Sequence, residues 1–319
     1  MKHFTTVHDV PDVEQLIQSA LQYKQKGRIP EPWTQHKKVG LIFFNPSLRT
    51  RLSAQVALQN LGIEAVVLDI GKDGWALEIE EGVVMNSDKA EHIKEAAAVM
   101  GAYFDVLAIR TFPELKKRED DEQEKVLQAF IRYSGIPVVS LESATLHPLQ
   151  SLADVMTIRE NWTHQHKPKI VLTWAPHVKP LPQAVPNSFV EWMKALDADL
   201  TLACPSGYEL APNYINGLNV CNDQKSALEG ADFVYVKNWS SYQNYGKVLS
   251  KDLSWTFGME QHHITNQAKI MHCLPVRRGL VIDDEVLDGT HAIHLQQAKN
   301  RVPAAQAVFS ACLKERSHE

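Results

Sequence analysis

Short apolar runs, most of them rich in β-branched residues, alternate with segments of helical periodicity along most of the chain. Polar or turn-forming residues bound each run, which is the pattern of buried parallel strands. Strands are predicted at 39–44, 65–69, 104–109, 136–141, 169–174, 199–203, 233–236 and 269–273. Helical spacing predicts helices between them, for example at 89–100, 122–133 and 188–196. The alternation predicts an α/β protein whose mainly parallel sheets are flanked by helices on both faces.

The length of the chain and the position of one proline predict two domains. A chain of 319 residues suits two domains of roughly 150 residues each. Pro148 opens a helical pattern, and proline is favoured at the first helical position because its missing N–H costs nothing there. We therefore predict a first domain at 1–147 and a second at 148–295. A last helical pattern, at 296–319, predicts a helix that returns to the first domain.

A strand, a turn and a helix follow one another early in the chain. Asn45-Pro46 ends the predicted strand 39–44. The helix that follows is indicated by apolar residues at helical spacing up to Gly62, namely Leu48, Leu52, Val56 and Leu61. Segment 47–51, Ser-Leu-Arg-Thr-Arg, thus lies where unpaired N–H donors and the helix dipole favour an anion. Phosphate fits best, because arginine matches its oxygens. A capped surface helix with solvated arginines is the alternative.

Composition and charge narrow the class of protein. The chain is 44% hydrophobic and 22% charged, as ordinary soluble proteins are. A net charge of −5 argues against a general nucleic-acid binder. No apolar stretch approaches the length of about 18 residues that a membrane span needs, and the N-terminus lacks a signal-peptide core. The cysteines form no CxxC pair and are Cys204, Cys221, Cys273 and Cys312. We expect reduced thiols, a cytoplasmic protein and no membrane partner.

Three further motifs carry chemistry at predicted strand or helix ends. Arg110-Thr111 follows one strand, His147-Pro148-Leu149-Gln150 opens a helix, and His272-Cys273-Leu274-Pro275 ends the last strand. Each has an ordinary reading taken alone: a rim ion pair, a packed histidine and a buried apolar thiol. Because ligands bind at the carboxyl ends of parallel strands, their positions point to function together.

In this order and spacing, the motifs resemble the aspartate/ornithine carbamoyltransferase family over nearly the full chain. The resemblance implies a carbamoyl-phosphate domain and an amino-substrate domain joined by two helices, in a homotrimer with shared active sites. It assigns carbamoyl phosphate to Ser47, Leu48, Arg49, Thr50, Arg110, His147 and Gln150. It also implies that Arg110, His147, Cys273 and Leu274 orient the carbamoyl group. No metal or other cofactor is implied.

Three departures from ordinary ornithine carbamoyltransferases favour a branch that uses N-acylornithines. Segment 232–239 lacks the Ser-Met-Gly loop that holds the α-amino group of ornithine, and segment 174–182 is an additional proline-rich loop. Trp75 lies in a loop that the family donates to a neighbouring subunit. We count Trp75 with the carbamoyl-phosphate residues. The resemblance places four residues near the acylornithine: Glu142, His177, Lys237 and Arg277. Each also has a bland reading, as a cap, a loop support or a surface charge.

The acyl group is the hardest choice. Acetyl-specific relatives carry a glutamate, and succinyl-specific ones a proline, in the region where this chain has Ala90. Alanine neither fills the acyl pocket nor repels a succinyl carboxylate, to which Lys179 could supply a cation. We therefore predict transfer of the carbamoyl group to the δ-amine of N-succinyl-L-ornithine in arginine biosynthesis, with N-acetyl-L-ornithine as the alternative. A simple helix-start role for Ala90 stays open.

Two other classes of protein make opposite predictions from the same pattern. A dinucleotide-dependent oxidoreductase needs a G-x-G-x-x-G turn after a strand with an acidic residue about twenty positions on, and the sequence has none. A binding protein that has lost activity should show gaps among the phosphate residues, and none are missing. The histidines lack the carboxylate or cysteine spacing of a metal site.

Overall fold

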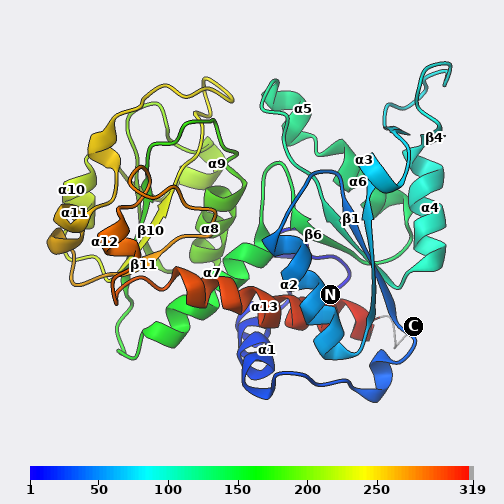
Figure 1. The fold of residues 1–319 in the computed structure, drawn as a ribbon, viewed down its shortest axis with the longest axis horizontal. Helices are drawn as coiled ribbons and strands as arrows, with labels where there is room; N and C mark the ends of the chain where they lie inside the picture. The colour runs from blue at the N-terminus through cyan, green and yellow to red at the C-terminus, as the bar shows by residue number, and fades with distance from the viewer. Residues whose placement is uncertain (316–319) are drawn as a thin grey trace. The chain divides into compact units, whose positions relative to one another are not determined.

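The computed structural model describes residues 1–315, apart from the side chain of Glu315, and shows two compact units (Figure 1). Unit 1 comprises Met1–Glu114, Glu119–Leu149 and the described residues from Arg301 onward, and unit 2 comprises Leu115–Arg118 and Gln150–Asn300. Within the described residues, no helix combines the length and the apolar character needed to cross a membrane. The predicted two-domain α/β class is confirmed.

Unit 1 is built on a four-stranded parallel sheet in the order β2-β1-β5-β6. Its strands are β1 (Lys38–Phe43), β2 (Glu64–Asp69), β5 (Val106–Arg110) and β6 (Val138–Glu142). All but the first residue of β1 and all of β5 and β6 are buried, as expected for strands covered on both faces. The four carboxyl ends therefore meet at one edge, where Figure 1 shows the chain turning into helices and loops.

Helices α2 (Arg49–Leu61), α3 (Ile70–Asp73), α4 (Ile93–Tyr103) and α6 (Lys125–Tyr133) contact strands of this sheet. Unit 1 also contains α1 (Val13–Lys26) and all but the first residue of α5 (Arg118–Glu122). Apolar side chains of α4 and α6, such as Ala97 and Phe130, join strand residues Ile42, Leu107 and Val138 in one core. Two short strands, β3 (Leu77–Glu78) and β4 (Glu91–His92), pair with each other outside the main sheet.

Unit 2 contains a five-stranded parallel sheet in the order β11-β10-β7-β8-β9. Its strands are β7 (Lys169–Trp174), β8 (Asp199–Ala203), β9 (Asn219–Cys221), β10 (Phe233–Lys237) and β11 (Lys269–Met271). Its short or medium helices are α8 (Ala184–Ala195), α9 (Pro212–Ile215), α10 (Gln224–Leu228), α11 (Met259–Ile264) and α12 (Asp284–Leu287). Fully buried Trp174, Trp192 and Trp239 fill its core.

Two long helices carry the chain from one unit to the other. Helix α7 (Pro148–Asn161) begins in unit 1 and continues in unit 2, and α13 (His294–Glu315) runs from unit 2 back into unit 1. Both therefore match the two predicted interdomain helices. The domain limits 1–147 and 148–295 stay a prediction, and residues 316–319 of the predicted return segment lie outside the described residues.

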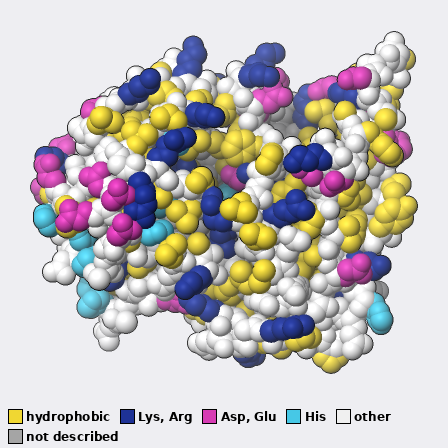
Figure 2. All heavy atoms as spheres, in the orientation of Figure 1, with side chains coloured by type: hydrophobic (Ala, Val, Ile, Leu, Met, Phe, Trp, Pro, Cys, Tyr) yellow, Lys and Arg dark blue, Asp and Glu magenta, His cyan; other side chains and the backbone are white. Residues whose placement is uncertain are grey.

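The helix predicted after the first strand is present, but its apolar spacing does not mark its buried face. Leu48, at the N-cap of α2, is 69% exposed, and Leu52 and Val56 within the helix are 53% and 40% exposed. The buried side of α2 is lined by smaller residues and two leucines: Thr50, Ala54, Ala57, Leu58 and Leu61. Figure 2 shows apolar side chains at the surface of this unit among charged ones. The chain thus exposes a row of apolar side chains along one helix.

Candidate active site

The turn after β1 presents the start of α2 as an anion-binding loop, here residues 45–50. The N-cap position, Leu48, makes no side-chain hydrogen bond to the first turn of the helix. The N–H groups of that turn therefore remain available at the positive end of the helix dipole. Within the described chain, the buried Nε of Arg49 has no hydrogen-bond partner. The loop combines backbone donors with a guanidinium donor, which suits phosphate.

Thr50 has a buried hydroxyl whose oxygen accepts a hydrogen bond from another helix. Its Oγ1 accepts a hydrogen bond of 2.7 Å from Nη2 of Arg301, on α13. A guanidinium has only donors, so the oxygen lone pair is used by Arg301 and the O–H of Thr50 remains free to donate elsewhere. Thr50 is buried, which holds the hydroxyl in this arrangement. Arg301 is thus a residue that sequence reasoning missed.

Arg110 holds the anion-binding loop by hydrogen bonds to its backbone. It ends β5 opposite Glu142 of β6, and its Nη2 and Nε donate to Oε2 of Glu142 at 2.8 and 3.1 Å. Its Nη1 donates to the carbonyl oxygens of Asn45 and Pro46 at 3.2 and 3.1 Å. The ion pair is buried, so losing either partner would leave an uncompensated charge. Glu142, expected beside the acylornithine, lies against Arg110 in this structure.

His147 is a buried, neutral imidazole just before α7. Burial lowers its pKa well below 6.5, and the charges of Arg301 and Arg110 lower it further. Its Nδ1 has no hydrogen-bond partner among the residues that the structure describes. A buried ring nitrogen without a partner is costly unless a ligand satisfies it. The position suits a hydrogen bond to a carbonyl-type substrate.

Unit 2 gathers cations around one histidine, and we call His177, Lys179, Lys237 and Arg277 the cation cluster. Nε of Arg277 donates to Nε2 of His177 at 3.1 Å, and Nδ1 of His177 lies 2.9 Å from the carbonyl oxygen of Lys179. The backbone N–H of Lys179 also lies 3.1 Å from Nδ1 of His177, so the ring is held by the loop that carries it. Burial lowers the pKa of His177, as do the charges of Arg277, Lys237 and Lys179. A neutral histidine among three cations suits a carboxylate ligand.

Lys237 ends β10 with a buried side chain. Its Nζ donates to the carbonyl oxygen of Asn238 at 2.9 Å, and Asn238 in turn donates to the carbonyl oxygen of Ala175 at 2.6 Å. These bonds join the end of β10 to the proline-rich loop that carries His177. A lysine therefore lies at the end of this strand, in the segment that lacks the Ser-Met-Gly sequence.

The segment His272–Pro275 leaves β11 in a constrained conformation. The backbone N–H of His272 donates to Oε1 of Gln297 at 2.9 Å, and Nδ1 of His272 accepts from the N–H of Leu274 at 2.8 Å. Leu274 has φ = 57°, in the left-handed region that a leucine rarely adopts, and a cis bond joins it to Pro275. The left-handed backbone of Leu274 is strained and persists only where surrounding contacts impose it, which is typical of ligand-binding segments.

Family models match both units of this chain. The aspartate/ornithine carbamoyltransferase carbamoyl-P binding domain matches residues 2–160, and the aspartate/ornithine carbamoyltransferase Asp/Orn binding domain matches residues 182–312. The chain belongs to the aspartate/ornithine carbamoyltransferase family. It is an enzyme of the carbamoyltransferase class, which confirms the class predicted from the motifs.

Relatives within this carbamoyltransferase family match almost the entire chain. An N-succinylornithine carbamoyltransferase of Bacteroides thetaiotaomicron is 47% identical over 98% of this chain and 99% of its own length. An N-acetylornithine carbamoyltransferase of Xanthomonas axonopodis pv. citri is 35% identical over 98% and 96%. Among solved structures, a Glu-to-Ala variant of N-acetyl-L-ornithine transcarbamylase, complexed with carbamyl phosphate and N-succinyl-L-norvaline, aligns with a TM-score of 0.92 at 34% identity, covering 98% of this chain and all of the other.

The carbamoyltransferase residues predicted from sequence fall into separate groups. In unit 1, Ser47 to Thr50, Arg110, Glu142 and His147 lie at the carboxyl edge of the sheet. In unit 2, His177, Lys237 and Arg277 form the cation cluster with Lys179, whereas Gln150, Cys273 and Leu274 lie at the start of α7 and after β11. Trp75 is 58% exposed and bonds Glu91, next to exposed Ala90. These two residues lie on loops around β3 and β4, and their roles stay predictions.

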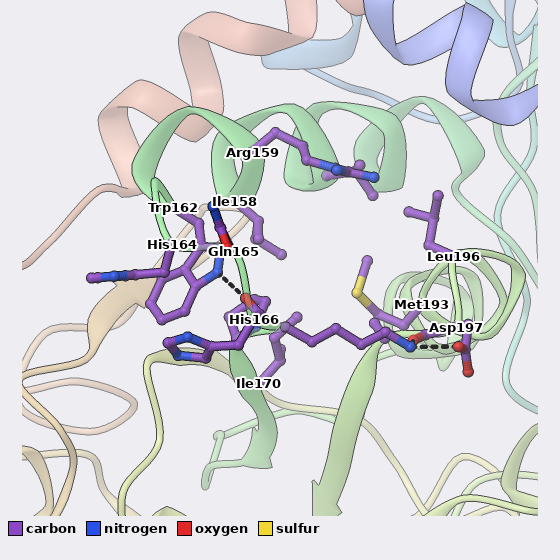
Figure 3. A pocket seen from close by; sticks show the side chains of 14 residues that line it. Ile158, Arg159, Trp162, His164, Gln165, His166, Ile170, Met193, Leu196 and Asp197 are labelled. Carbon is purple, nitrogen blue, oxygen red and sulfur yellow. Dashed lines mark hydrogen bonds and ion pairs between the residues drawn. The ribbon is translucent and has the colours of Figure 1, made fainter.

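A separate pocket of about 250 Å³ in unit 2 contains none of the predicted residues (Figure 3). It lies between the end of α7, the loop 162–168 and the end of α8. Within it, Nε1 of Trp162 donates to the carbonyl oxygen of His166, and Lys167 pairs with Asp197. Among the described residues, no three His, Cys, Asp or Glu side chains are grouped so that they could hold a metal ion.

Proposed function

We propose that this carbamoyltransferase moves the carbamoyl group of carbamoyl phosphate to the δ-amine of N-succinyl-L-ornithine, giving N-succinyl-L-citrulline and phosphate in arginine biosynthesis. The observation that carries the proposal is the 47% identity, over nearly the whole chain, to a relative named N-succinylornithine carbamoyltransferase, against 35% to an N-acetylornithine enzyme. Assays with alternative acceptors, set out at the end of the Discussion, test it.

The anion-binding loop is the proposed site for the phosphate of carbamoyl phosphate. Ser47, Leu48, Arg49 and Thr50 supply backbone, hydroxyl and guanidinium donors at the start of α2. Arg110 and neutral His147 lie at the same edge and are the proposed ligands of the carbamoyl oxygen. Trp75, from a neighbouring subunit, and Gln150 complete the proposed set of carbamoyl-phosphate ligands.

The cation cluster is the proposed site for the acylornithine. Acylation removes the positive charge of the α-nitrogen, so the acceptor presents one carboxylate in the acetyl form and two in the succinyl form. His177, Lys179, Lys237 and Arg277 offer three cations and a neutral ring to these groups. Lys237 is proposed for the α-carboxylate, and Glu142, which pairs with Arg110, is proposed to lie near the acylornithine as well.

The chemistry that these residues support is transfer by direct attack. The neutral δ-amine attacks the carbonyl carbon and a C–N bond forms. The C–O bond to phosphate breaks, and the proton lost by the amine nitrogen passes to the departing phosphate. Negative charge grows on the departing phosphate, where fixed cations and helix N–H groups stabilise the transition state more than the ground state. Holding both substrates in line supplies much of the remaining acceleration. Cys273 and Leu274 are proposed to orient the carbamoyl group.

Ala90 is the proposed determinant of the acyl group. Solved structures of N-acetyl-L-ornithine transcarbamylase include variants in which a glutamate is replaced by alanine, proline, valine or serine. Each of these variants is complexed with N-succinyl-L-norvaline. Ala90 lies in the region of this chain that resembles the position of that glutamate, and its side chain is exposed. A small side chain there leaves room for the longer acyl group. N-Acetyl-L-ornithine is the second candidate, supported by a relative complexed with acetylcitrulline.

We propose that the enzyme works as a homotrimer with shared active sites in the cytoplasm. The row of exposed apolar residues on α2, Leu48, Leu52 and Val56, supports a contact with a second copy, because such rows are usually covered in an assembly. Trp75 is also exposed and available to a neighbour. The cysteines form no disulfide bond within the described residues, as expected in a reducing compartment.

Mixing two inactive variants tests whether Trp75 acts in a neighbouring subunit. Trp75→Ala and Arg49→Ala should each be nearly inactive alone. After subunit exchange in an equal mixture, about a quarter of the sites combine an intact Trp75 with an intact Arg49, so roughly a quarter of the wild-type activity should return. No recovery despite mass-spectrometric evidence of mixed trimers, or a fully active monomer at high dilution, would contradict shared sites.

A further inference from the structure

A buried carboxylate lies one turn along α7 from Gln150. Asp154 is fully buried, and its Oδ1 accepts two hydrogen bonds from amide groups. One comes from Nε2 of Gln150 at 2.7 Å and the other from Nε2 of Gln297, on α13, at 2.6 Å. A carboxylate only accepts hydrogen bonds when ionised, so it determines which end of each glutamine amide faces it.

The contact with Asp154 leaves the oxygen of Gln150 facing away from the carboxylate. Gln150 is 1% exposed, and its Oε1 has no hydrogen-bond partner within the described part of the chain. A buried carbonyl oxygen without a partner is costly unless a donor arrives with a ligand. Gln150 is therefore prepared to accept a hydrogen bond from an N–H group. It is not prepared to bind a phosphate or carboxylate oxygen through Oε1.

The same carboxylate orients the second glutamine toward the segment that follows β11. With its Nε2 on Asp154, Gln297 turns Oε1 to the backbone N–H of His272 at 2.9 Å. Tyr235 of β10 is fully buried, and burial together with the neighbouring charges of Asp154 and Cys273 raises the pKa of its phenol well above 10. Asp154 thus lies among groups that contact both Gln150 and the segment His272–Pro275.

We infer that Asp154 is a positioning residue: by holding the amide nitrogens of Gln150 and Gln297, it makes Gln150 an acceptor for the NH₂ of the carbamoyl group and fixes the backbone that carries Cys273 and Leu274. The inference rests on the proposed function, because it names carbamoyl phosphate as the donor of that N–H. Both glutamine amides donate to the same oxygen, Oδ1, and asparagine would keep such an oxygen with two lone pairs. Leucine at 154 has nearly the same shape but accepts no hydrogen bond, so neither amide would be held and the oxygen of Gln150 would no longer be reserved for substrate.

The test is a double-mutant cycle of Asp154→Leu and Gln150→Ala, with kcat and KM measured for both substrates. Asp154→Leu should lower kcat/KM for carbamoyl phosphate by about ten- to hundredfold, the size of effect seen when a polar contact to substrate is mismatched. The KM for the acylornithine should change little. In the Gln150→Ala background the same substitution should lower kcat/KM by a smaller factor, because residues that act as a unit are not additive. The loss that remains is the part that acts through Gln297 and the segment His272–Pro275.

Glu160→Met is the matched control, because it also replaces a carboxylate of α7 by an apolar side chain of similar size. Glu160 lies in the same helix and also accepts hydrogen bonds from two amides of α13, from Gln296 and Asn300 at 2.9 Å each, but it is distant from Gln150 in the sequence of α7. This control substitution should change the denaturant midpoint of unfolding without changing the KM for carbamoyl phosphate. Asp154→Leu behaving like this control, or losing equal activity in both backgrounds, would overturn the inference.

Assays of the wild-type enzyme distinguish a failure of this inference from a failure of the proposed function. Saturable turnover of carbamoyl phosphate with an acylornithine establishes the reaction independently of Asp154. If the reaction is present but Gln150→Ala leaves the KM for carbamoyl phosphate unchanged, the positioning role is wrong and the function stands. If wild-type protein does not consume carbamoyl phosphate, both are wrong.

Discussion

Arg49→Ala should lower kcat by roughly 10² to 10³ while the protein stays folded. Removing one preorganised donor from a developing negative charge typically costs this much in rate. The buried Nε of Arg49 has no partner among the described residues, so its removal breaks no hydrogen bond within that part of the chain. Steady-state turnover of carbamoyl phosphate, together with circular dichroism and a urea unfolding curve, measures both effects.

Arg51→Ala serves as the control for Arg49. It removes the same charge from the same helix two residues later, where the side chain is exposed. We expect its kcat to stay within a few-fold of the wild-type value, since exposed charges contribute little through solvent screening. Near wild-type turnover of Arg49→Ala would show that the anion-binding loop does not bind the leaving phosphate.

Ala90→Glu should shift the acceptor preference from N-succinylornithine toward N-acetylornithine. Glutamate adds volume where the longer acyl chain would extend, and it adds a carboxylate near the succinyl carboxylate. Like charges a few ångströms apart cost about 1–4 kcal/mol, depending on exposure, which is roughly 5- to 10³-fold in relative rate. Acetyl lacks both the length and the charge. The readout is the ratio of kcat/KM for the two acceptors, and selectivity would arise from repulsion of the disfavoured substrate.

Ala90→Gln separates the two causes of this shift. Glutamine has the size of glutamate without its charge, so any shift it produces is steric, and the additional shift in Ala90→Glu is electrostatic. Increasing ionic strength should weaken the electrostatic part, because salt screens exposed charges. An unchanged acceptor ratio in both variants would mean that Ala90 does not line the acyl pocket.

The main sheets of this fold could be predicted because their strands are long and strongly apolar. β1, β5 and β7 are buried along almost their whole length, so the apolar runs mark them directly. β9 and the pair β3 and β4 were missed because they are only two or three residues long and partly exposed. The exposed face of α2 could not be told from a buried one, since helical spacing does not say which face meets the sheet.

The parts of the candidate site that are contiguous in sequence could be predicted, whereas the contacts between distant segments could not. The anion-binding loop is contiguous in sequence, so Ser47 to Thr50 could be found as a motif. The ion pair between Arg110 and Glu142 needs two neighbouring strands, and the bond from Arg301 to Thr50 joins residues 251 positions apart. Asp154 was also missed, although its spacing of four residues from Gln150 on one helix was a signal that could have been used.

Acceptor specificity of the purified wild-type enzyme tests the central claim most directly. kcat/KM is measured at saturating carbamoyl phosphate with N-succinylornithine, N-acetylornithine and ornithine, and each citrulline product is identified by mass. We expect N-succinylornithine to be the best acceptor and N-acetylornithine to be weaker. Ornithine should be poorer by orders of magnitude, because its α-ammonium would meet the cation cluster and burying an unpaired charge costs several kcal/mol as an order of magnitude. Efficient formation of citrulline from ornithine, or a clear preference for N-acetylornithine, would contradict the proposed function.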